Sequence, residues 1–413
     1  MTRHTVVVGG GIVGAFCAWY LLKTGRSVTI VEADRFSSGC SHGNCGFICP
    51  SHVFPLPAPG QIRRIFRGML QRHTPLRIPL RWSPSLWLWL LRFAWHCNRR
   101  HMRRAGAARH QLLQSSMTEY RNLAECGELI PEWHDCGLLF VCRDDSTMTE
   151  LLQTSDVLRR DYQLTSRHLT ANELCELEPG LRPGLAGAIW FDGDAHVRPD
   201  RVMSSLKSAL RSQGAVIEEG FRVSSIASAG NTATAVCSED DREIAADEFV
   251  VATGALTPFL NHALGCRIPI QPGKGYSITM AKTDRCPRYP MILEECHVAL
   301  TPFDTGFRIG STMEFSGYNS KLNRGRLQYL RDGAAEYLCE PIDEHTEEEW
   351  FGWRPMTSDG LPYIDRTSRY SNVWLAAGHN MIGLSTAPAT GRLVSELIAG
   401  MKPHVDPEPF RIR

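Results

Sequence analysis

The sequence contains no run of 18 apolar residues, so no membrane-spanning helix is expected. Apolar residues make up 43% of the 413 residues and charged residues 22%, which excludes a disordered, collagen-like or coiled-coil chain. No apolar leader region precedes the first strand, and the 14 cysteines lack the spacing of a small disulfide scaffold. We therefore expect a cytoplasmic protein of two or three domains, or one large interleaved domain, with mostly reduced cysteines.

One long segment lacks acidic residues and lysine. Residues 35–118 contain 13 arginines, so the rest of the chain carries 32 basic residues against 44 acidic ones. Within residues 61–110 lie twelve of these arginines and four tryptophans, Trp82, Trp87, Trp89 and Trp95. This composition is typical of a helix that lies on an anionic membrane surface, here on the cytoplasmic face. A helix packed in the core, with solvated or paired arginines, explains it equally well. No base-reading motif accompanies it, so nucleic acid is not an expected partner.

The first forty residues follow the pattern of a dinucleotide-binding βαβ unit. A strand at residues 5–8 leads into Gly9-Gly-Gly-Ile-Val-Gly14, a helix to about residue 24 and a second strand at residues 27–31. Gly9 permits the tight turn, Gly11 lets backbone amides approach a pyrophosphate, and Gly14 lets the helix pack closely on the strand. Glu32 lies 21 residues after Gly11, where its carboxylate would accept hydrogen bonds from a ribose diol. The unit predicts a bound dinucleotide.

Two later segments repeat the combination of an apolar strand and glycine. Residues 249–254 read Phe-Val-Val-Ala-Thr-Gly, and residues 372–378 read Asn-Val-Trp-Leu-Ala-Ala-Gly before a helix that starts near Gly383. Each segment alone is explained by an ordinary strand-to-helix turn. Together they predict one nucleotide-binding domain that is assembled from separate parts of the chain, with backbone lying close to a flat ligand.

With these motifs, the sequence resembles the D-amino-acid oxidase-like superfamily of FAD-dependent oxidoreductases, and most closely its D-amino-acid dehydrogenase (D-proline or hydroxyproline dehydrogenase-like) branch. The resemblance implies that the substrate is a D-amino acid or a cyclic imino acid of the D-proline or D-hydroxyproline type. The resemblance depends on the N-terminal fingerprint and on four further segments, residues 40–48, 272–277, 353–362 and 378–391. It implies an α/β Rossmann-type FAD-binding domain interlaced with an α+β substrate domain built on a twisted antiparallel sheet. Residues 1–90, 192–261 and 352–413 would form the FAD-binding domain, and residues 91–191 and 262–351 the substrate domain.

The resemblance also implies the residues that contact FAD. They are Gly9, Gly11, Ile12, Val13, Gly14, Glu32, Ala33, Ser41, His42, Asn44, Gly46, Val223, Thr253, Gly254, Gly378, Gly383, Leu384 and Ser385. We expect this FAD to be non-covalent, because residues 353–356 lack the cysteine that holds the flavin in some relatives. His42 is the alternative attachment point, and non-covalent contact is the preferred interpretation for it.

The implied reaction is oxidation of a C–N bond, with hydride passing from the substrate to the flavin. Arg354 matches the family arginine that binds a substrate carboxylate through two parallel donors. Tyr276 matches a tyrosine of the substrate cavity that could bind the same carboxylate, although a plain core tyrosine is nearly as good an interpretation. Lys274 is not assigned a catalytic role.

Two positions depart from the oxidase relatives. Met381 stands where glycine oxidase-like sequences have a second arginine, and Ser385 stands where sarcosine oxidase-like sequences have a lysine that promotes reaction with oxygen. Both departures favour a dehydrogenase whose acceptor is not oxygen, and a membrane quinone is a candidate acceptor. A glycine or sarcosine-type oxidase and an electron-relay flavoprotein subunit of a larger complex are the alternatives.

The spacing of Cys40, Cys45 and Cys49 is only loosely similar to that of an iron–sulfur site, which needs four thiolates. We expect no metal there.

Overall fold

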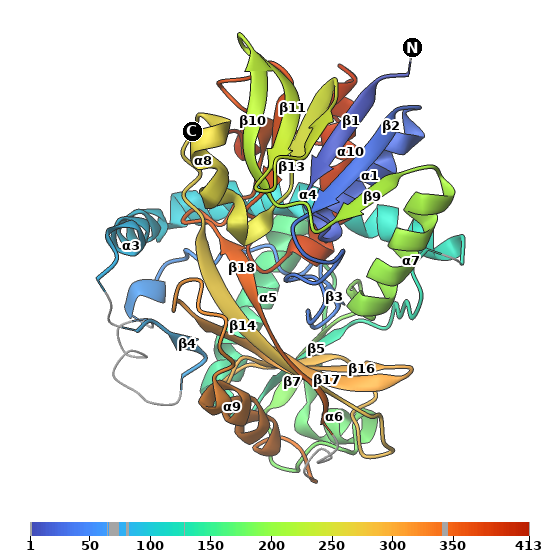
Figure 1. Ribbon diagram of the computed structural model, residues 1–413. Coiled ribbons are helices and arrows are strands. Elements are labelled where there is room, and N and C mark those ends of the chain that lie inside the picture. Colours follow the sequence, from blue (N-terminus) through green and yellow to red (C-terminus); the bar gives the residue numbers. More distant parts are fainter. Residues whose placement is uncertain are drawn as a thin grey trace.

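Two large sheets, joined by long crossing segments, organise the chain (Figure 1). The computed structural model describes residues 2–63, 65, 74–79, 82–127, 129–340 and 346–412. The first sheet has the order β19-β20-β13-β1-β2-β9 and is parallel except between β19 and β20. Its strands are β1 (His4–Val8), β2 (Ser27–Glu32), β9 (Val216–Glu219), β13 (Glu248–Val251), β19 (Tyr363–Arg366) and β20 (Val373–Ala377).

Helices with a buried apolar side form one hydrophobic cluster with the parallel sheet, whose central strands are buried on both faces. These helices are α1 (Ile12–Lys23), α4 (Arg99–Glu125), α7 (Pro199–Ser212) and α10 (Gly383–Ile398). Helix α1 lies directly on α10, where a Cβ at Gly391 would stand 2.5 Å from the carbonyl carbon of Phe16. Further elements near this sheet are β10 (Val223–Ala229), β11 (Thr232–Ser238), β12 (Glu243–Ala245), η1 (Gly254–Leu260), α8 (Asn261–Leu264) and η2 (Glu408–Phe410).

The second sheet has the order β18-β14-β17-β16-β15-β5-β7-β6, with β4 added to β17. Its pairs are antiparallel except β15 with β5 and β17 with β4. Its strands are β4 (Leu76–Arg77), β5 (Leu138–Cys142), β6 (Arg167–Thr170), β7 (Gly187–Phe191), β14 (Gln271–Met280), β15 (Met291–Leu293), β16 (Val298–Phe303), β17 (Gly306–Glu314) and β18 (Thr346–Met356). Three helices accompany this sheet, α5 (Asp145–Tyr162), α6 (Ala171–Leu177) and α9 (Arg324–Ala335).

The two faces of the second sheet have different roles. Leu327 and Leu330 of α9 pack with Ile278 and Ile309 on one face to form a buried cluster. The opposite face contacts residues 40–46, which we call the flavin loop because the family resemblance predicts that they pass over the flavin. This loop ends at β3 (Phe47–Ile48), which pairs with β8 (Ala195–His196). The sheet therefore has an apolar face toward α9 and a polar face toward the flavin loop.

The expected fold class, a Rossmann-type sheet combined with a twisted antiparallel sheet, is confirmed. The expected domain boundaries stay predictions. Strand β18 pairs with β14 along its whole length, from Thr346 to Met356, and so crosses the expected boundary at residue 352. Strand β4, expected in the FAD-binding domain, pairs with β17 of the second sheet.

Helix α3 (Pro84–His96) covers one edge of the second sheet. Its buried side, Leu86, Trp89 and Phe93, packs with Phe315 and Met356. In the described part of the chain, no helix is both long and apolar enough to cross a membrane.

Candidate functional site

The fingerprint glycines are required by close backbone contacts. Gly9 has a φ of +113°, and a Cβ there would lie 2.6 Å from the carbonyl oxygen of Ala252. A Cβ at Gly14 would lie 1.9 Å from the carbonyl oxygen of Gly9. Neither position tolerates a side chain, and together they bring the start of α1 against the ends of β1 and β13.

The backbone amides at the N-terminus of α1 lie beside a hydroxyl and a carboxylate. Gly11 is the N-cap residue, and the Ile12 N–H donates to Oγ of Ser41 at 2.9 Å. The Glu32 carboxylate accepts from the N–H groups of Gly10 at 2.7 Å and Asp34 at 3.1 Å. A diphosphate favours a helix N-terminus and a ribose diol favours such a carboxylate, so these residues fit the adenosine diphosphate half of FAD.

Other expected cofactor residues gather at the carboxyl ends of the parallel strands, where ligands of such sheets bind. Thr253 and Gly254, with φ of +54° at Gly254, follow β13 and begin η1. Gly378, with φ of +82°, follows β20, and Gly383 and Leu384 begin α10. Ala33 directly follows β2, Val13 lies in the first turn of α1, and Val223 begins β10. Contact with FAD at each of these positions stays a prediction.

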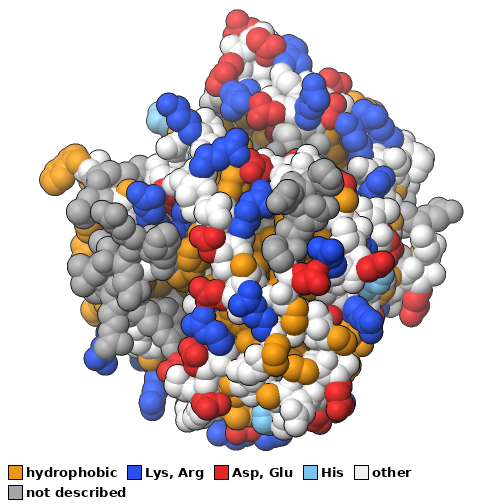
Figure 2. Space-filling view, turned by 90° about the horizontal axis from the view of Figure 1, so that it is seen from below, with side chains coloured by type: hydrophobic (Ala, Val, Ile, Leu, Met, Phe, Trp, Pro, Cys, Tyr) orange, Lys and Arg blue, Asp and Glu red, His pale blue; other side chains and the backbone are white. Residues whose placement is uncertain are grey.

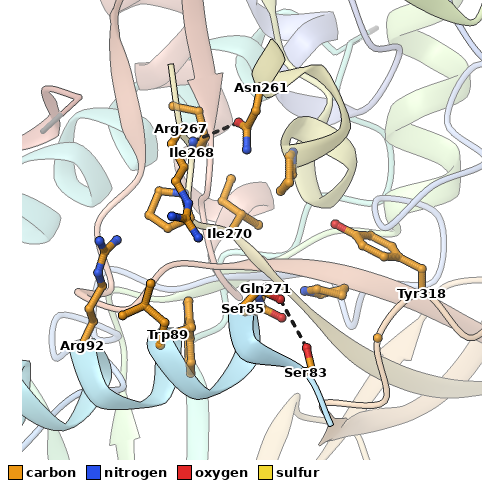
Figure 3. A pocket seen from close by; sticks show the side chains of 15 residues that line it. Ser83, Ser85, Trp89, Arg92, Asn261, Arg267, Ile268, Ile270, Gln271 and Tyr318 are labelled. Carbon is orange, nitrogen blue, oxygen red and sulfur yellow. Dashed lines mark hydrogen bonds between the residues drawn. The ribbon is translucent and has the colours of Figure 1, made fainter. Parts of the chain in front are cut away.

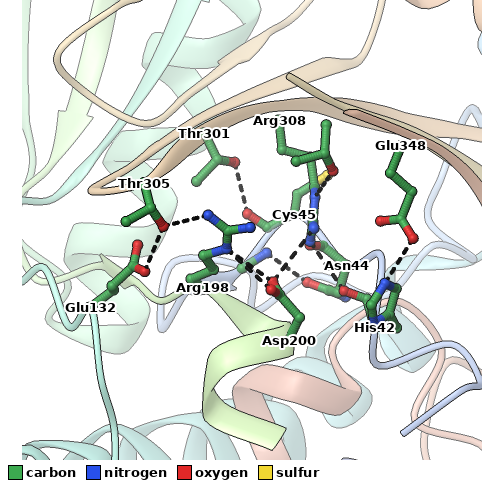
Figure 4. A network of polar contacts seen from close by, with 12 residues as sticks. His42, Asn44, Cys45, Glu132, Arg198, Asp200, Thr301, Thr305, Arg308 and Glu348 are labelled. Atoms are coloured by element: carbon green, nitrogen blue, oxygen red, sulfur yellow. Dashed lines mark hydrogen bonds and ion pairs between the residues drawn. The ribbon is translucent and has the colours of Figure 1, made fainter. Parts of the chain in front are cut away.

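A polar network fixes the flavin loop to the second sheet (Figure 4). The Arg308 side chain is 1% exposed and donates to the carbonyl oxygens of His42 at 3.1 Å and Asn44 at 2.7 Å. Its Nε donates to Oγ1 of Thr279 at 2.9 Å, and Thr301 donates to the carbonyl oxygen of Cys45 at 2.7 Å. Because every donor sits on the sheet and every loop acceptor is a backbone carbonyl, the sheet sets the path of the loop.

Two glycines let the loop lie this close. Gly46 has a φ of +86°, and a Cβ there would stand 2.0 Å from the carbonyl oxygen of Val197. A Cβ at Gly43 would stand 2.1 Å from the indole of Trp350. The Asn44 side chain accepts from the Gly46 N–H at 2.8 Å and stabilises the turn between them.

His42 makes an ion pair with Glu348 of β18, with Nε2 and Oε1 2.9 Å apart. The hydrogen bond to Glu348 raises the pKa of His42, while partial burial opposes that rise. In Figure 4 the His42 ring points toward Glu348. This contact gives His42 a structural function that does not need a covalent bond to flavin.

Arg354 lies on the loop-facing side of the second sheet. A Cβ at Gly275 would stand 2.4 Å from its Cζ, so the guanidinium crosses directly over Gly275. Its Nη1 donates to the carbonyl oxygen of Thr312 at 2.8 Å and its Nη2 to that of Ser311 at 3.2 Å. Burial raises the pKa of the Cys45 thiol, and the nearby charges of Arg354 and Arg308 oppose the rise. Arg354 thus places a half-buried positive charge close to the flavin loop.

The side chain of Tyr276 does not lie on the same face of the sheet as Arg354. It follows Gly275 in β14, so its side chain points to the opposite face of the sheet. The ring is 1% exposed, belongs to the cluster beneath α9, and its hydroxyl donates to Glu314 at 2.7 Å. Burial and this hydrogen bond raise the pKa of Tyr276. The geometry corrects the expectation of a shared carboxylate contact and supports the core-tyrosine interpretation.

Ser385 and Met381, the two residues that differ from the oxidase relatives, lie in different environments. The Ser385 hydroxyl donates to the carbonyl oxygen of Phe47 at 2.8 Å and accepts from the Cys49 N–H at 3.4 Å, which ties α10 to the end of the flavin loop. Met381 is 40% exposed. Nearby, burial lowers the pKa of His379 to about 3, so this ring is neutral.

Sequence reasoning missed the residues that hold the loop, namely Arg308, Thr301, Thr279, Glu348 and Asp200. Asp200 lies 3.6 Å from Arg308 and also pairs with Arg198 (Figure 4). Alternating polar residues in β16 and β17 were the available signal, because Leu300 and Ile309 face α9 while Thr301 and Arg308 face the loop.

A cavity of about 260 Å³ lies apart from these residues, between α3, α8 and the start of β14 (Figure 3). Trp89, Arg92, Asn261, Arg267 and Tyr318 are among its lining residues. None of the expected cofactor or substrate residues lines it.

Comparisons with known proteins agree with this geometry. Residues 4–397 match the family model described as FAD dependent oxidoreductase. The chain is 30% identical to a D-amino acid dehydrogenase from Dechloromonas aromatica (strain RCB), over 98% of this chain and 99% of that protein. It is 29% identical to a D-amino acid dehydrogenase from Methylobacterium radiotolerans, over 97% of each protein.

Among solved structures, glycine oxidase from Geobacillus kaustophilus is similar with a TM-score of 0.80 and 23% identity, covering 100% of this chain and 99% of that one. L-Proline dehydrogenase from P. horikoshii is similar with a TM-score of 0.75 and 20% identity, covering 99% of this chain and 96% of that one. These two similarities, at 20–23% identity, show the fold alone. The family match spans nearly the whole chain, and the glycine-rich turn, the N-terminus of α1 and Glu32 suit the nucleotide that the family binds. The chain therefore belongs to the family of FAD-dependent oxidoreductases.

Proposed function

We propose that this protein is a dehydrogenase that oxidises the C–N bond of a D-amino acid or of a cyclic imino acid of the D-proline or D-hydroxyproline type. The observation that carries the proposal is the place of Arg354, whose guanidinium lies over Gly275 on the face of the sheet that meets the flavin loop. The relatives at 29–30% identity, which match over nearly their whole length and are named D-amino acid dehydrogenases, support the substrate class.

Bound FAD would supply the acceptor for the hydride that leaves the substrate. The chain's own residues would position the substrate. Arg354 binds the carboxylate, since a guanidinium offers parallel donors to two carboxylate oxygens. Its bonds to Ser311 and Thr312 fix the orientation of the guanidinium in advance, which reduces the entropy lost on binding.

We propose that FAD is held without a covalent bond. Residues 353–356 read Trp-Arg-Pro-Met and contain no cysteine, and the His42 ring is engaged by Glu348. The contacts of Glu32, Ser41 and the α1 amides would then hold the cofactor by hydrogen bonds alone.

The acceptor that we propose is a membrane quinone rather than oxygen. Ser385 supplies no positive charge where oxidase relatives have a lysine, and its hydroxyl donates a hydrogen bond to the carbonyl oxygen of Phe47. A glycine or sarcosine-type oxidase is the alternative, and the rate at which air reoxidises the reduced flavin distinguishes the two. After anaerobic reduction by substrate, a dehydrogenase should be reoxidised slowly by air and quickly by an artificial quinone, whereas peroxide release at the rate of quinone reduction would establish an oxidase.

Contact with a membrane surface would bring the enzyme to that quinone. One side of α3 is exposed and apolar, with Trp87 42%, Leu91 70% and Trp95 83% exposed, and Trp82 just before the helix is 93% exposed. Arg99, Arg100, Arg103 and Arg104 follow at the start of α4. The view from below the second sheet shows acidic and basic side chains mixed over that surface, without such a concentration of one sign (Figure 2). The α3 side therefore suits anionic lipid better.

An electron-relay subunit of a larger complex is the remaining alternative. It would lack substrate-dependent reduction of its flavin when purified alone, and it would copurify with redox partners. Reduction of the isolated protein by an amino or imino acid would exclude this alternative.

A further inference from the structure

A group of three metal-ligating side chains lies just beyond the flavin loop. Cys49 and His52 follow β3, and Asp194 precedes β8, the strand that pairs with β3. One ligand atom from each of the three residues lies within 4.8 Å of the ligand atoms of the other two. The proposed substrate and cofactor chemistry uses none of them.

The three groups are withdrawn from solvent. Cys49 and Asp194 are each 1% exposed. Nδ1 of His52 is buried, and no residue in the described ranges gives it a hydrogen bond. A buried, unpaired ring nitrogen is unfavourable unless another group binds it, so this atom indicates a missing partner.

The Asp194 carboxylate is oriented by a neighbour of the group. Its Oδ1 accepts from the Ser51 N–H at 3.0 Å and its Oδ2 accepts from the Ser51 hydroxyl at 2.5 Å. Each carboxylate oxygen keeps a further lone pair for a metal ion. Hydrogen bonds that fix a ligating carboxylate in this way are a regular property of protein metal sites.

The donor set selects among metals. Thiolate sulfur, imidazole nitrogen and carboxylate oxygen together suit zinc, whereas magnesium and calcium prefer oxygen ligands alone. A divalent ion with one thiolate and one carboxylate carries no net charge, which suits a buried position. Arg109 donates to the His52 carbonyl oxygen at 2.7 Å, which fixes the backbone that carries this ligand.

We propose that Cys49, His52 and Asp194 bind one Zn²⁺ ion, with a water or the Ser51 hydroxyl as the fourth ligand. The ion joins the segment after the flavin loop to the turn between β7 and β8. Its ligand Cys49 also donates through its N–H to Ser385 of α10 at 3.4 Å, so the ion stabilises the junction of the loop, α10 and β8. Its function is structural.

Metal content of the intact holoenzyme tests the proposal. Protein purified without chelator should retain about one zinc ion per chain after gel filtration. Chelator-treated holoenzyme should bind added Co²⁺ and develop a thiolate charge-transfer band and ligand-field bands, the latter at longer wavelengths than oxidised FAD absorbs. Absence of retained zinc together with absence of these bands would overturn the proposal.

Matched variants identify the ligands. Cys49→Ser and His52→Gln should each weaken zinc binding by at least about 100-fold, because loss of a residue that merely supports a ligand already costs roughly 10–100-fold. Cys286→Ser and His110→Gln are the controls, since both residues lie outside the group, Cys286 is buried, and Nδ1 of His110 is likewise buried and unpaired within the described chain. The controls should bind zinc as the parent does. If Cys49→Ser fails to fold, zinc binding by His52→Gln and the cobalt spectrum of the parent protein test the assignment. Undiminished zinc binding by His52→Gln would refute it.

Discussion

Replacing Arg354 with lysine should weaken the use of a carboxylate substrate while leaving the FAD content unchanged. The guanidinium makes two bonds to the carbonyl oxygens of Ser311 and Thr312 and keeps further donors for a ligand. A lysine ammonium can keep one of these backbone contacts, but it cannot present two parallel donors to a carboxylate.

The magnitude follows from the bond that is lost. A hydrogen bond to a charged group contributes about 1.5–3 kcal/mol, which corresponds to a loss of roughly 10- to 150-fold in kcat/KM. We expect most of this loss as a higher KM, because the carboxylate is held both before and during hydride transfer. The assay is anaerobic dye reduction with a panel of D-amino and imino acids, together with the ratio of bound FAD to protein.

Arg326→Lys is the matched control. Like Arg354, Arg326 donates to two backbone carbonyls, those of Thr74 at 2.7 Å and Pro75 at 2.8 Å. It is buried and lies on α9 at the other face of the sheet. It should change stability and leave KM unaltered. An unchanged KM in Arg354→Lys, or an equal rise in both variants, would remove Arg354 from the substrate site.

Three further results are expected. Acid or heat precipitation should release FAD into the supernatant, and a flavin that stays with the denatured chain would indicate a covalent bond, first of all at His42. The His42–Glu348 pair should stabilise the fold fully between the usual pKa of glutamate and the usual pKa of histidine, and this stabilisation should be lost as pH falls through the lowered pKa of Glu348 or rises through the raised pKa of His42. Thermal unfolding of Glu348→Gln across pH should show a smaller difference from the parent outside this range. Leu91→Ser and Trp95→Ser should each reduce sedimentation of the protein with anionic liposomes, and binding of the parent protein to these liposomes should weaken as salt rises. The control Met401→Ser, which changes an exposed residue outside α3, should have no effect.

The nucleotide-binding part could be predicted because its determinants are local. The close approach at Gly14 and the place of Glu32 depend on residues within one βαβ unit, since Gly14 lies against Gly9 and Glu32 accepts from Gly10. The contact that excludes a side chain at Gly9 is with the distant Ala252, but the fingerprint spacing still marks the position. The parallel sheet followed from the same unit, repeated by the glycine-terminated strands β13 and β20.

The substrate side could be predicted only in part, because its determinants are distant in sequence. Arg308 reaches the flavin loop 264 residues away at Asn44, and no local pattern indicates that pairing. The choice between a cavity tyrosine and a core tyrosine at Tyr276 could not be made from the sequence, because strand alternation cannot be oriented without knowing that α9 covers one side of the sheet. Likewise, α3 combines a core side at Leu86 and an exposed side at Leu91, and composition alone could not divide the two.

The central claim is that the bound flavin takes a hydride from a D-amino or D-imino acid, and anaerobic mixing tests it most directly. The oxidised-flavin absorbance of the purified protein should be lost on addition of at least one D-amino or D-imino acid and should persist with the L-enantiomer. Loss of absorbance with L-enantiomers or glycine but with no D-compound, or a fully FAD-loaded protein that no amino or imino acid reduces, would contradict the account.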